Sequence, residues 1–246
     1  MSAKIIMVWG KSNSGKTTFA ANLACALSQR DMLVGLVSSN LYYGDLQILF
    51  GEKVPLEKGL FQALNEDNPV IGDRFSGYGE SKNLFYLSVP SLYTGLLCDT
   101  VTLSSVERVI NDAVLIFDIL IIDGDGQLAN PISGAGLWLA ERIYTLHRPS
   151  LAAQMWYQSV SDFVNELHIA AKQVHVLQAP NGEFCDKTYQ SMTGLSFPYE
   201  LPYIKQAAEL ENAGKPIYFF RDGACKRYRK VLDRITNDIC GGIKVE

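Results

Sequence analysis

The sequence of 246 residues is poor in cysteine and histidine and has no strong excess of either charge. Its three histidines show no metal-ligand spacing, and its cysteines form no C-x-x-C pair, so a structural zinc site is not expected. The cysteines are odd in number and widely scattered, which is typical of reduced thiols in a cytoplasmic protein. They are Cys25, Cys98, Cys185, Cys225 and Cys240.

Charge and hydropathy exclude further classes of protein. With 22 basic and 26 acidic residues, the net charge of −4 gives no general attraction to nucleic acid or to an anionic membrane. No apolar run approaches the roughly 18 residues of a membrane span, and the N-terminus leads directly into an apolar segment, so we expect no membrane helix and no signal peptide. A hydrophobic content of 48% predicts a globular protein, which we interpret as one domain over residues 1–246.

A glycine-bounded loop near the N-terminus carries the strongest signal. Residues 10–17 fit G-x-x-x-x-G-K-[ST], with an apolar strand over 4–9 before them and a helix over 17–29 after them. In such a loop the backbone N–H groups wrap a phosphate, Lys16 reaches the β- and γ-phosphates, and Thr17 ligates Mg²⁺. The sequence therefore predicts a nucleotide-binding site, against the alternative of an ordinary Gly/Ser turn. Its residues are Gly10, Lys11, Ser12, Asn13, Ser14, Gly15, Lys16, Thr17 and Thr18.

Apolar runs alternate with segments of helical spacing along the rest of the chain. This alternation without repeats predicts an α/β fold with a doubly wound, mainly parallel sheet and helices on both faces. Such sheets bind ligands at the carboxyl ends of their strands, where the glycine loop would lie. The expected strands are 33–37, 84–89, 117–123, 142–146 and 174–177, the expected helices are 60–65, 103–114, 150–172, 204–212 and 222–239, and 68–82 is expected to be an exposed loop.

An acid at the end of the most apolar strand is the second candidate for the phosphate site. Four apolar residues over 119–122 precede Asp123, so this carboxylate would lie at the carboxyl edge of the sheet. We expect Asp123 to hold Mg²⁺ through water, against the alternative of a plain strand cap. Asp125 follows between two glycines, which would let the backbone pass close to the γ-phosphate.

The stretch 11–17 also holds a second lysine, Lys11, at its start. In this it resembles the MinD/ParA family of deviant Walker-A P-loop ATPases, whose loop reads K-G-G-x-G-K-[ST], although here the two inner glycines are replaced. The resemblance continues through 22–24, the strand at 33–37, Asp123, and two later stretches, Leu-Pro-Tyr at 201–203 and Gly-Lys-Pro at 214–216. No D-P-Q sequence follows Asn40, so the resemblance is closer to MinD-like, septum- or pilus-positioning members than to the standard plasmid ParA.

The resemblance implies a dimer operated by a nucleotide. In the family, ATP with Mg²⁺ lies between two subunits, and Lys11 would reach the partner's phosphates while Lys16 serves its own. The alternative for Lys11 is a solvated loop lysine. The segment around Pro202 would lie against the base and favour adenine, with guanine left open. Such a dimer positions or partitions a cargo or an assembly.

One departure from the family pattern concerns hydrolysis. The family's second strand ends in D-x-D, and its second Asp positions the attacking water, whereas here these places hold Ser38 and Asn40. Neither is an anionic base, and such groups are worth about 10²–10⁴-fold in rate. We therefore expect a weak or degenerate ATPase in which Asn40 stands at the catalytic position, with Asp45 and Asp125 as possible substitutes. Replacing Asn40 with Asp should change turnover.

Several alternatives remain open at this point. An active ParA-type ATPase could bind DNA without sequence preference through the basic residues of the C-terminal segment, for which a solvated helix face is the alternative. A small-molecule kinase or ligase could use the same scaffold. We expect the apolar stripe of the last helix to pack on the sheet and not on a membrane. The basic residues are Arg221, Lys226, Arg227, Arg229, Lys230 and Arg234, and the stripe is Val231, Leu232, Ile235 and Ile239.

Overall fold

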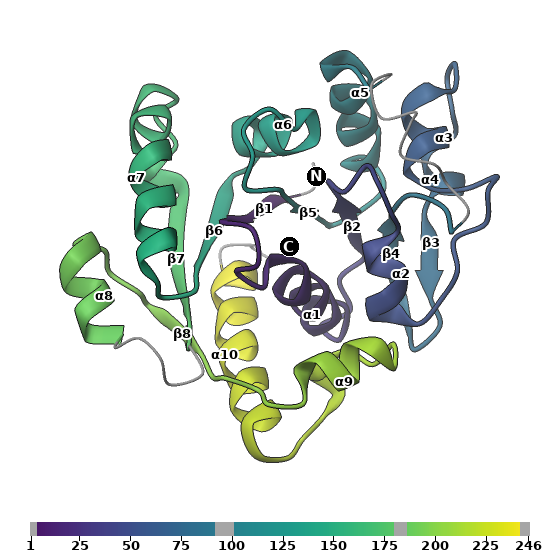
Figure 1. Ribbon diagram of the computed structural model, residues 1–246. Helices are drawn as coiled ribbons and strands as arrows, with labels where there is room; N and C mark the ends of the chain where they lie inside the picture. Colours follow the sequence, from purple (N-terminus) through teal and green to yellow (C-terminus); the bar gives the residue numbers. More distant parts are fainter. Residues whose placement is uncertain (1–3, 92–100, 180–185, 242–246) are drawn as a thin grey trace.

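The structure of the chain is a computed structural model that describes residues 4–91, 101–179 and 186–241. Cys98, Cys185 and residues 242–246 lie outside these ranges. The described residues form an eight-stranded sheet with the order β3-β4-β2-β5-β1-β6-β7-β8 (Figure 1). The strands are β1 (Lys4–Gly10), β2 (Val34–Ser38), β3 (Ser76–Tyr78), β4 (Ser81–Leu87), β5 (Ile119–Asp123), β6 (Arg142–His147), β7 (Gln173–Gln178) and β8 (Tyr199–Leu201).

The sheet has the mainly parallel pairing that the alternation of strands and helices predicted. Every neighbouring pair in the described sheet is parallel except β3 and β4. Asp123 at the end of β5 pairs in register with Val8 of β1 and with Ser38 of β2. Gly10 at the end of β1 pairs with Leu146 of β6. The carboxyl ends of these four strands therefore lie along one edge, where doubly wound sheets bind ligands.

Helices cover both faces of the sheet. Figure 1 shows α5 and α6 on one side of the sheet and α1 and α10 on the other. Alternate residues of β1 explain this arrangement, because Ile6 and Val8 join the core under α1 and α10, while Met7 and Trp9 join the core under α5 and α6. The helices are α1 (Lys16–Ser28), α2 (Asp45–Phe50), α3 (Leu60–Asn65), α4 (Ile71–Arg74), α5 (Leu103–Ala113), α6 (Pro131–Leu139), α7 (Leu151–Glu166), α8 (Asp186–Thr193), α9 (Ala207–Asn212) and α10 (Gly223–Cys240), with 3₁₀ turns at Ala170–Lys172 and Ile217–Phe219.

The last helix packs as its apolar stripe predicted. Leu232, Ile235 and Ile239 are fully buried in the core that also contains α1. Within the described ranges, no helix has both the length and the apolar character needed to cross a membrane. The three described cysteines are free thiols, as the scattered cysteine pattern suggested: Cys25, Cys225 and Cys240.

Two expected elements are corrected by the structure. Residues 68–82 are not an exposed loop, because Phe75 and Tyr78 are buried and Ser76–Tyr78 forms an edge strand antiparallel to β4. The helix expected over 150–172 ends at Glu166, because His168 adopts a left-handed φ of 54° that stops the helix before a 3₁₀ turn. Both predictions were wrong because strand pairing in one case and backbone conformation in the other, rather than hydrophobic spacing, determine the local structure.

Candidate functional site

The glycine-bounded loop joins β1 to α1 in the expected strand–loop–helix arrangement. Gly15, immediately before α1, has a φ of 85°, and a Cβ there would lie 2.3 Å from Oε1 of Gln178. The left-handed φ favours glycine here, and any other side chain would also displace the end of the Gln178 side chain. Asn13 is also left-handed, with a φ of 63°, and Ser14 N–H donates to Lys11 O at 3.1 Å. The loop is thus a tight turn whose shape is held by its own backbone.

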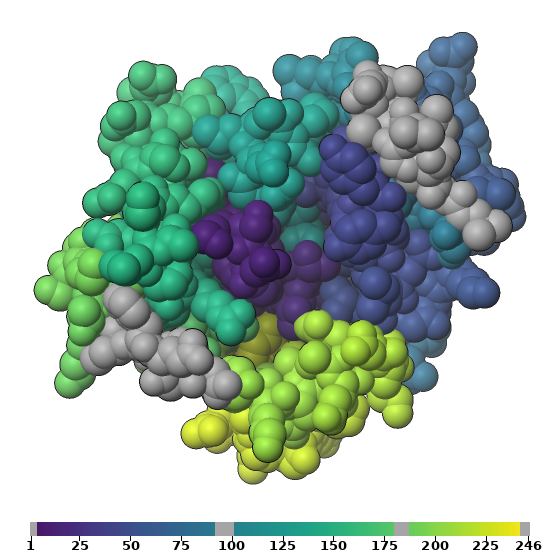
Figure 2. Space-filling model, viewed as in Figure 1, coloured from purple at the N-terminus to yellow at the C-terminus, as the bar shows by residue number. Residues whose placement is uncertain are grey.

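The loop lies at the bottom of a hollow. Figure 2 shows the purple atoms of the N-terminal segment recessed between the blue, teal and yellow-green segments that surround them. Two cavities meet here, one of about 240 Å³ at the strand ends and one of about 320 Å³ over the loop. Lys16, Thr17, Tyr43 and Asp45 line both cavities. Lys16 and Thr17, two of the sequence-predicted phosphate residues, therefore face open space and not the core.

The two lysines of the loop differ in burial. Lys16 is 9% exposed, and its Nζ donates to the carbonyl oxygen of Lys11 at 3.1 Å. Burial lowers the pKa of Lys16, while the negative charges of Asp123 and Asp125 oppose this shift. Lys11 is half-buried, and its Nζ reaches the Ser12 carbonyl oxygen at 3.4 Å. Lys16 thus lies deep in the site, whereas Lys11 is partly exposed at the start of the loop and lines neither cavity.

Asp123 has the environment of an incomplete ligand site. It is 3% exposed, and its Oδ1 has no hydrogen-bond partner among the described residues. Burial, then the charge of Asp45, raises the pKa of Asp123 to about 7, against a hydrogen bond from Thr17 and the charge of Lys16. In the described ranges no three His, Cys, Asp or Glu side chains are grouped to hold a metal by themselves. The buried, unpartnered Asp123 oxygen suits an ion that takes one or two carboxylates and completes its shell with phosphate and water.

Known proteins similar in sequence match only part of this chain, and no protein family model matches it. An iron–sulfur cluster carrier protein of Aquifex aeolicus is 40% identical over 81 residues, covering 25% of this chain. The septum site-determining protein MinD of Thermotoga maritima is 25% identical over 150 residues, covering 61% of this chain. The matches span 22% and 53% of the length of these two relatives.

Solved structures match over nearly the whole chain. The septum site-determining protein MinD from Pyrococcus horikoshii, complexed with Mg-ADP, gives a TM-score of 0.78 at 18% identity and covers 99% of both chains. A ParA family ATPase from Chlorobium tepidum gives a TM-score of 0.78 at 17% identity, covering 95% of this chain and 99% of that one. This chain has the MinD/ParA fold. The fold that the resemblance implied is thereby confirmed.

The end of β2 is where this MinD/ParA fold lacks the acids that the resemblance implied. Ser38 Oγ donates to Asp45 Oδ1 at 2.8 Å and accepts from Asn40 N–H at 3.1 Å. Asn40 Oδ1 accepts from the backbone N–H groups of Tyr42 and Tyr43, at 3.0 and 3.3 Å. Both side chains therefore shape the loop that leads from β2 into α2.

The remaining predicted nucleotide residues lie on either side of the MinD/ParA P-loop. Thr18 Oγ1 donates a hydrogen bond to Glu211 of α9, which links α1 to the C-terminal part of the chain. Pro202 directly follows β8 and is half-buried, but it lines neither of the two cavities. Sequence reasoning missed Glu211 and Gln178. Gln178 ends a strand at the ligand edge, which is a usable signal, whereas nothing in the sequence around Glu211 marks it.

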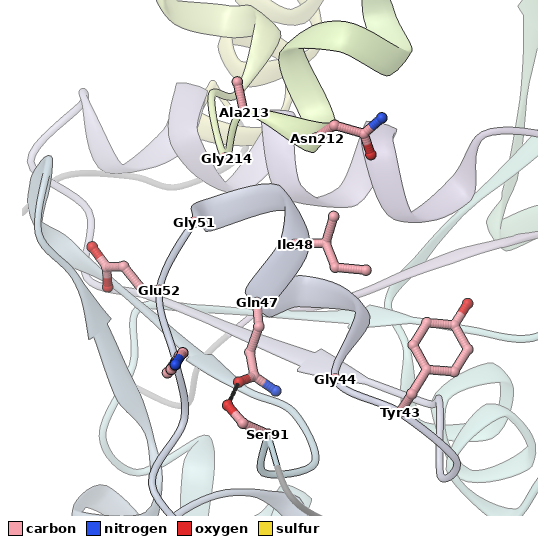
Figure 3. A pocket seen from close by; sticks show the side chains of 11 residues that line it. Tyr43, Gly44, Gln47, Ile48, Gly51, Glu52, Ser91, Asn212, Ala213 and Gly214 are labelled. Atoms are coloured by element: carbon pink, nitrogen blue, oxygen red, sulfur yellow. Dashed lines mark hydrogen bonds between the residues drawn. The ribbon is translucent and has the colours of Figure 1, made fainter.

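A groove continues from the site between α2 and α9. It has a volume of about 630 Å³ and begins at Tyr43 and Ile48, which also line the cavity over the P-loop. Figure 3 shows Ile48 pointing towards α9, and Gln47 bonded to the Ser91 hydroxyl on the other side of α2. This part of the surface is therefore open beside the cavity over the loop.

The basic residues predicted as a possible DNA-binding surface differ in their contacts. The Arg229 guanidinium lies 5.0 Å from the centre of the Tyr218 ring, and Arg234 lies 5.2 Å from that of Tyr199. Arg229 also pairs with Asp233 at 3.8 Å. The others are exposed: Arg221, Lys226, Arg227 and Lys230. Two of the six cations therefore pack on tyrosine rings.

Proposed function

We propose that this chain is a cytoplasmic ATP- and Mg²⁺-dependent switch. Binding of ATP joins two copies, and the dimer positions or partitions another cellular component. The observation that carries this proposal is the difference between the two lysines of one loop: Lys16 is buried and lines both cavities, whereas Lys11 is partly exposed at the start of the loop. Among the described residues, the Lys11 Nζ hydrogen-bonds only the Ser12 carbonyl oxygen, so we infer that it is available to a second subunit's phosphates. The names of the relatives, a septum site-determining protein and a ParA family ATPase, support the same reading.

The residues present fit Mg²⁺ and ATP. The buried Asp123 Oδ1 lacks a partner among the described residues, and the Thr17 hydroxyl is hydrogen-bonded to the same carboxylate. The backbone of residues 13–18 would bind the phosphates, and Lys16 would exchange its bond to the Lys11 carbonyl for one to phosphate oxygen. When bound, Mg²⁺ neutralises charge on the β- and γ-phosphates. The Mg-ADP named with the Pyrococcus relative agrees with this donor set.

Hydrolysis in this proposal is slow. Ser38 and Asn40 carry no negative charge, and their hydrogen bonds are used within the chain. A water-orienting or basic group increases the rate of hydrolysis by about 10²–10⁴-fold. A weaker group therefore slows hydrolysis and prolongs the ATP-bound state. A long-lived state suits a switch whose output is assembly.

The proposal is tested by measuring ATP affinity with a fluorescent analogue and mass by light scattering, with and without Mg-ATP. Lys16→Ala should lose binding and dimer together. Lys11→Ala should keep ATP affinity within about threefold and lose the dimer, because its side chain acts across the interface. Lys82→Ala, an exposed lysine on β4, is the matched control. A wild type that binds ATP and stays monomeric would refute the switch.

A second candidate is a small-molecule kinase or ligase on the same scaffold. The groove between α2 and α9 favours it, because an acceptor there would lie next to the cavity over the P-loop. The same light-scattering experiment separates the two functions. A switch dimerises with ATP alone, whereas a kinase or ligase of this kind has no need to do so without its acceptor.

A further inference from the structure

The acids missing from the end of β2 are matched by an acid that enters the site from α2. Asp45 is the first residue of α2, and its Oδ1 accepts from Ser38 Oγ and from its neighbour Leu46 N–H, each at 2.8 Å. The Asn40 side chain also hydrogen-bonds Asp45. The two residues at the D-x-D places therefore hold a carboxylate that comes from five to seven residues further along the chain.

Asp45 lies where the two cavities of the site meet. It lines the cavity at the strand ends together with Asp123 and Asp125, and it also lines the cavity over the P-loop. Asp123 and Asp125 line only the first of these. A group that borders both the phosphate loop and the metal edge is suitably placed to touch a water beside the terminal phosphate.

Electrostatics explains why the acid can occupy this position. Asp45 and Asp123 line the same cavity at the strand ends, so their negative charges repel each other across it. Two further acids at positions 38 and 40 would add to that repulsion, whereas a serine hydroxyl and an asparagine amide donate hydrogen bonds to Asp45 instead. Lys16 is the cation that lines both cavities with Asp45. Ser38 and Asn40 at the end of β2 thus allow the Asp45 carboxylate of α2 to lie in the site without further repulsion.

We propose that Asp45 is the water-positioning carboxylate of this site. This inference rests on the proposed function, because it requires ATP in the P-loop. The Asp45 carboxylate accepts a hydrogen bond from a water, and the water oxygen attacks the γ-phosphorus. The bond from the γ-phosphorus to the β–γ bridging oxygen breaks, and this oxygen stays on ADP. The water's proton passes to Asp45 and then to solvent, leaving inorganic phosphate. Turnover is then slow but depends on Asp45 and not on Asn40.

The test compares wild type, Asp45→Asn, Asp45→Glu and the exposed control Asp73→Asn in single-turnover hydrolysis of Mg-ATP. Asp45→Asn preserves size and keeps one oxygen that can accept from Ser38 and Leu46, so it should fold, which its thermal unfolding checks. We expect a loss of about 100-fold or more in rate with ATP affinity within about threefold of wild type. Asp45→Glu should regain part of the rate, because it restores the carboxylate. Asp73→Asn should match wild type.

A second readout does not depend on turnover. Aluminium fluoride bound beside ADP mimics the transferring phosphoryl group together with its in-line water. If the protein holds that water, ADP should therefore bind more tightly in the presence of aluminium fluoride than in its absence. In Asp45→Asn, the increase in ADP affinity caused by aluminium fluoride should be at least about tenfold smaller than in wild type. The affinity for ADP alone should equal that of wild type. A purely structural role for Asp45 would weaken ADP binding with and without aluminium fluoride alike.

The outcomes separate this inference from the proposed function. A wild type that fails to bind ATP refutes the proposed function itself. A wild type that binds ATP and dimerises without cleaving it leaves the switch intact and refutes the role of Asp45. Asp45→Asn that cleaves as fast as Asp73→Asn also refutes it.

Discussion

Acidification from pH 7 to pH 5 should lower the free energy of unfolding by about 2 kcal/mol through His147 alone. This side chain ends β6 and is 1% exposed. Its Nδ1 lies 2.9 Å from the Tyr189 hydroxyl, and its Nε2 lies 3.0 Å from Nδ1 of His175. Burial, then the nearby His175, lowers the pKa of His147 to about 3, and burial lowers that of His175 to about 4.

The sign follows from which state binds protons. In the unfolded chain a histidine protonates below its ordinary pKa of 6.5, whereas the folded His147 stays neutral until the pH approaches 3. The unfolded state therefore binds more protons between these values, so stability is complete above pH 6.5 and falls progressively below it. One pKa unit is worth about 1.4 kcal/mol, and pH 5 lies 1.5 units below 6.5, which gives about 2 kcal/mol.

Urea denaturation followed by tryptophan fluorescence at pH 7 and pH 5 measures this loss. His147→Gln keeps a neutral hydrogen-bonding side chain, so it should remove about 2 kcal/mol of the pH dependence, whatever it costs in stability at pH 7. His168→Gln, at an exposed position, controls for the replacement of a histidine by glutamine as such. Equal losses in His147→Gln and wild type would refute the reasoning.

Three further predictions concern the site. Gly15→Ala should weaken ATP binding about tenfold or more, because a residue with a Cβ pays about 1–3 kcal/mol to adopt the left-handed φ of Gly15. Isothermal titration calorimetry measures the affinity, and an unchanged affinity would contradict the prediction. Asn40→Asp alone should slow single-turnover hydrolysis by adding repulsion next to Asp45, whereas Asn40→Asp combined with Asp45→Asn should recover rate; recovery by Asn40→Asp alone would contradict the placement of Asp45. Charge reversal at both Arg227 and Lys230 should leave DNA gel mobility as in wild type, because we expect a solvated face, and loss of a wild-type shift would assign DNA binding there.

Much of the fold could be predicted because its elements are strongly periodic or strongly apolar. The strands that became β1, β2, β5, β6 and β7 are short apolar runs, and they were located to within about two residues. The helix α6 was missed although Asn130 and Pro131 mark its start, whereas β3 and α2 were missed because they are short and depend on tertiary contacts. β3 is a three-residue edge strand that exists through pairing with β4, and α2 begins at a residue that also bonds Ser38 across the site.

The site could be predicted where a motif fixes spacing along the chain. Lys16, Thr17 and Asp123 are brought together as expected, because the P-loop and the end of β5 share one edge of the sheet. The sequence offered Asp45 only as one of two possible substitutes for a missing acid. Its position relative to Ser38 depends on how the loop after β2 turns, and that turn is set by hydrogen bonds from Tyr42 and Tyr43 to Asn40 that no periodicity encodes.

The P-loop is flanked by two indole rings. Trp9 immediately precedes Gly10, and its ring centre lies 5.0 Å from that of Trp156, with an angle of 66° between the planes. Trp156 Nε1 also donates to the Gly126 carbonyl at 3.1 Å, in the loop that follows β5. The remaining tryptophan, Trp138, is exposed. Replacing it with phenylalanine would leave Trp9 and Trp156, which pack together beside the loop, as the tryptophan emitters, so that the proposed binding and release of nucleotide could be timed without an attached dye.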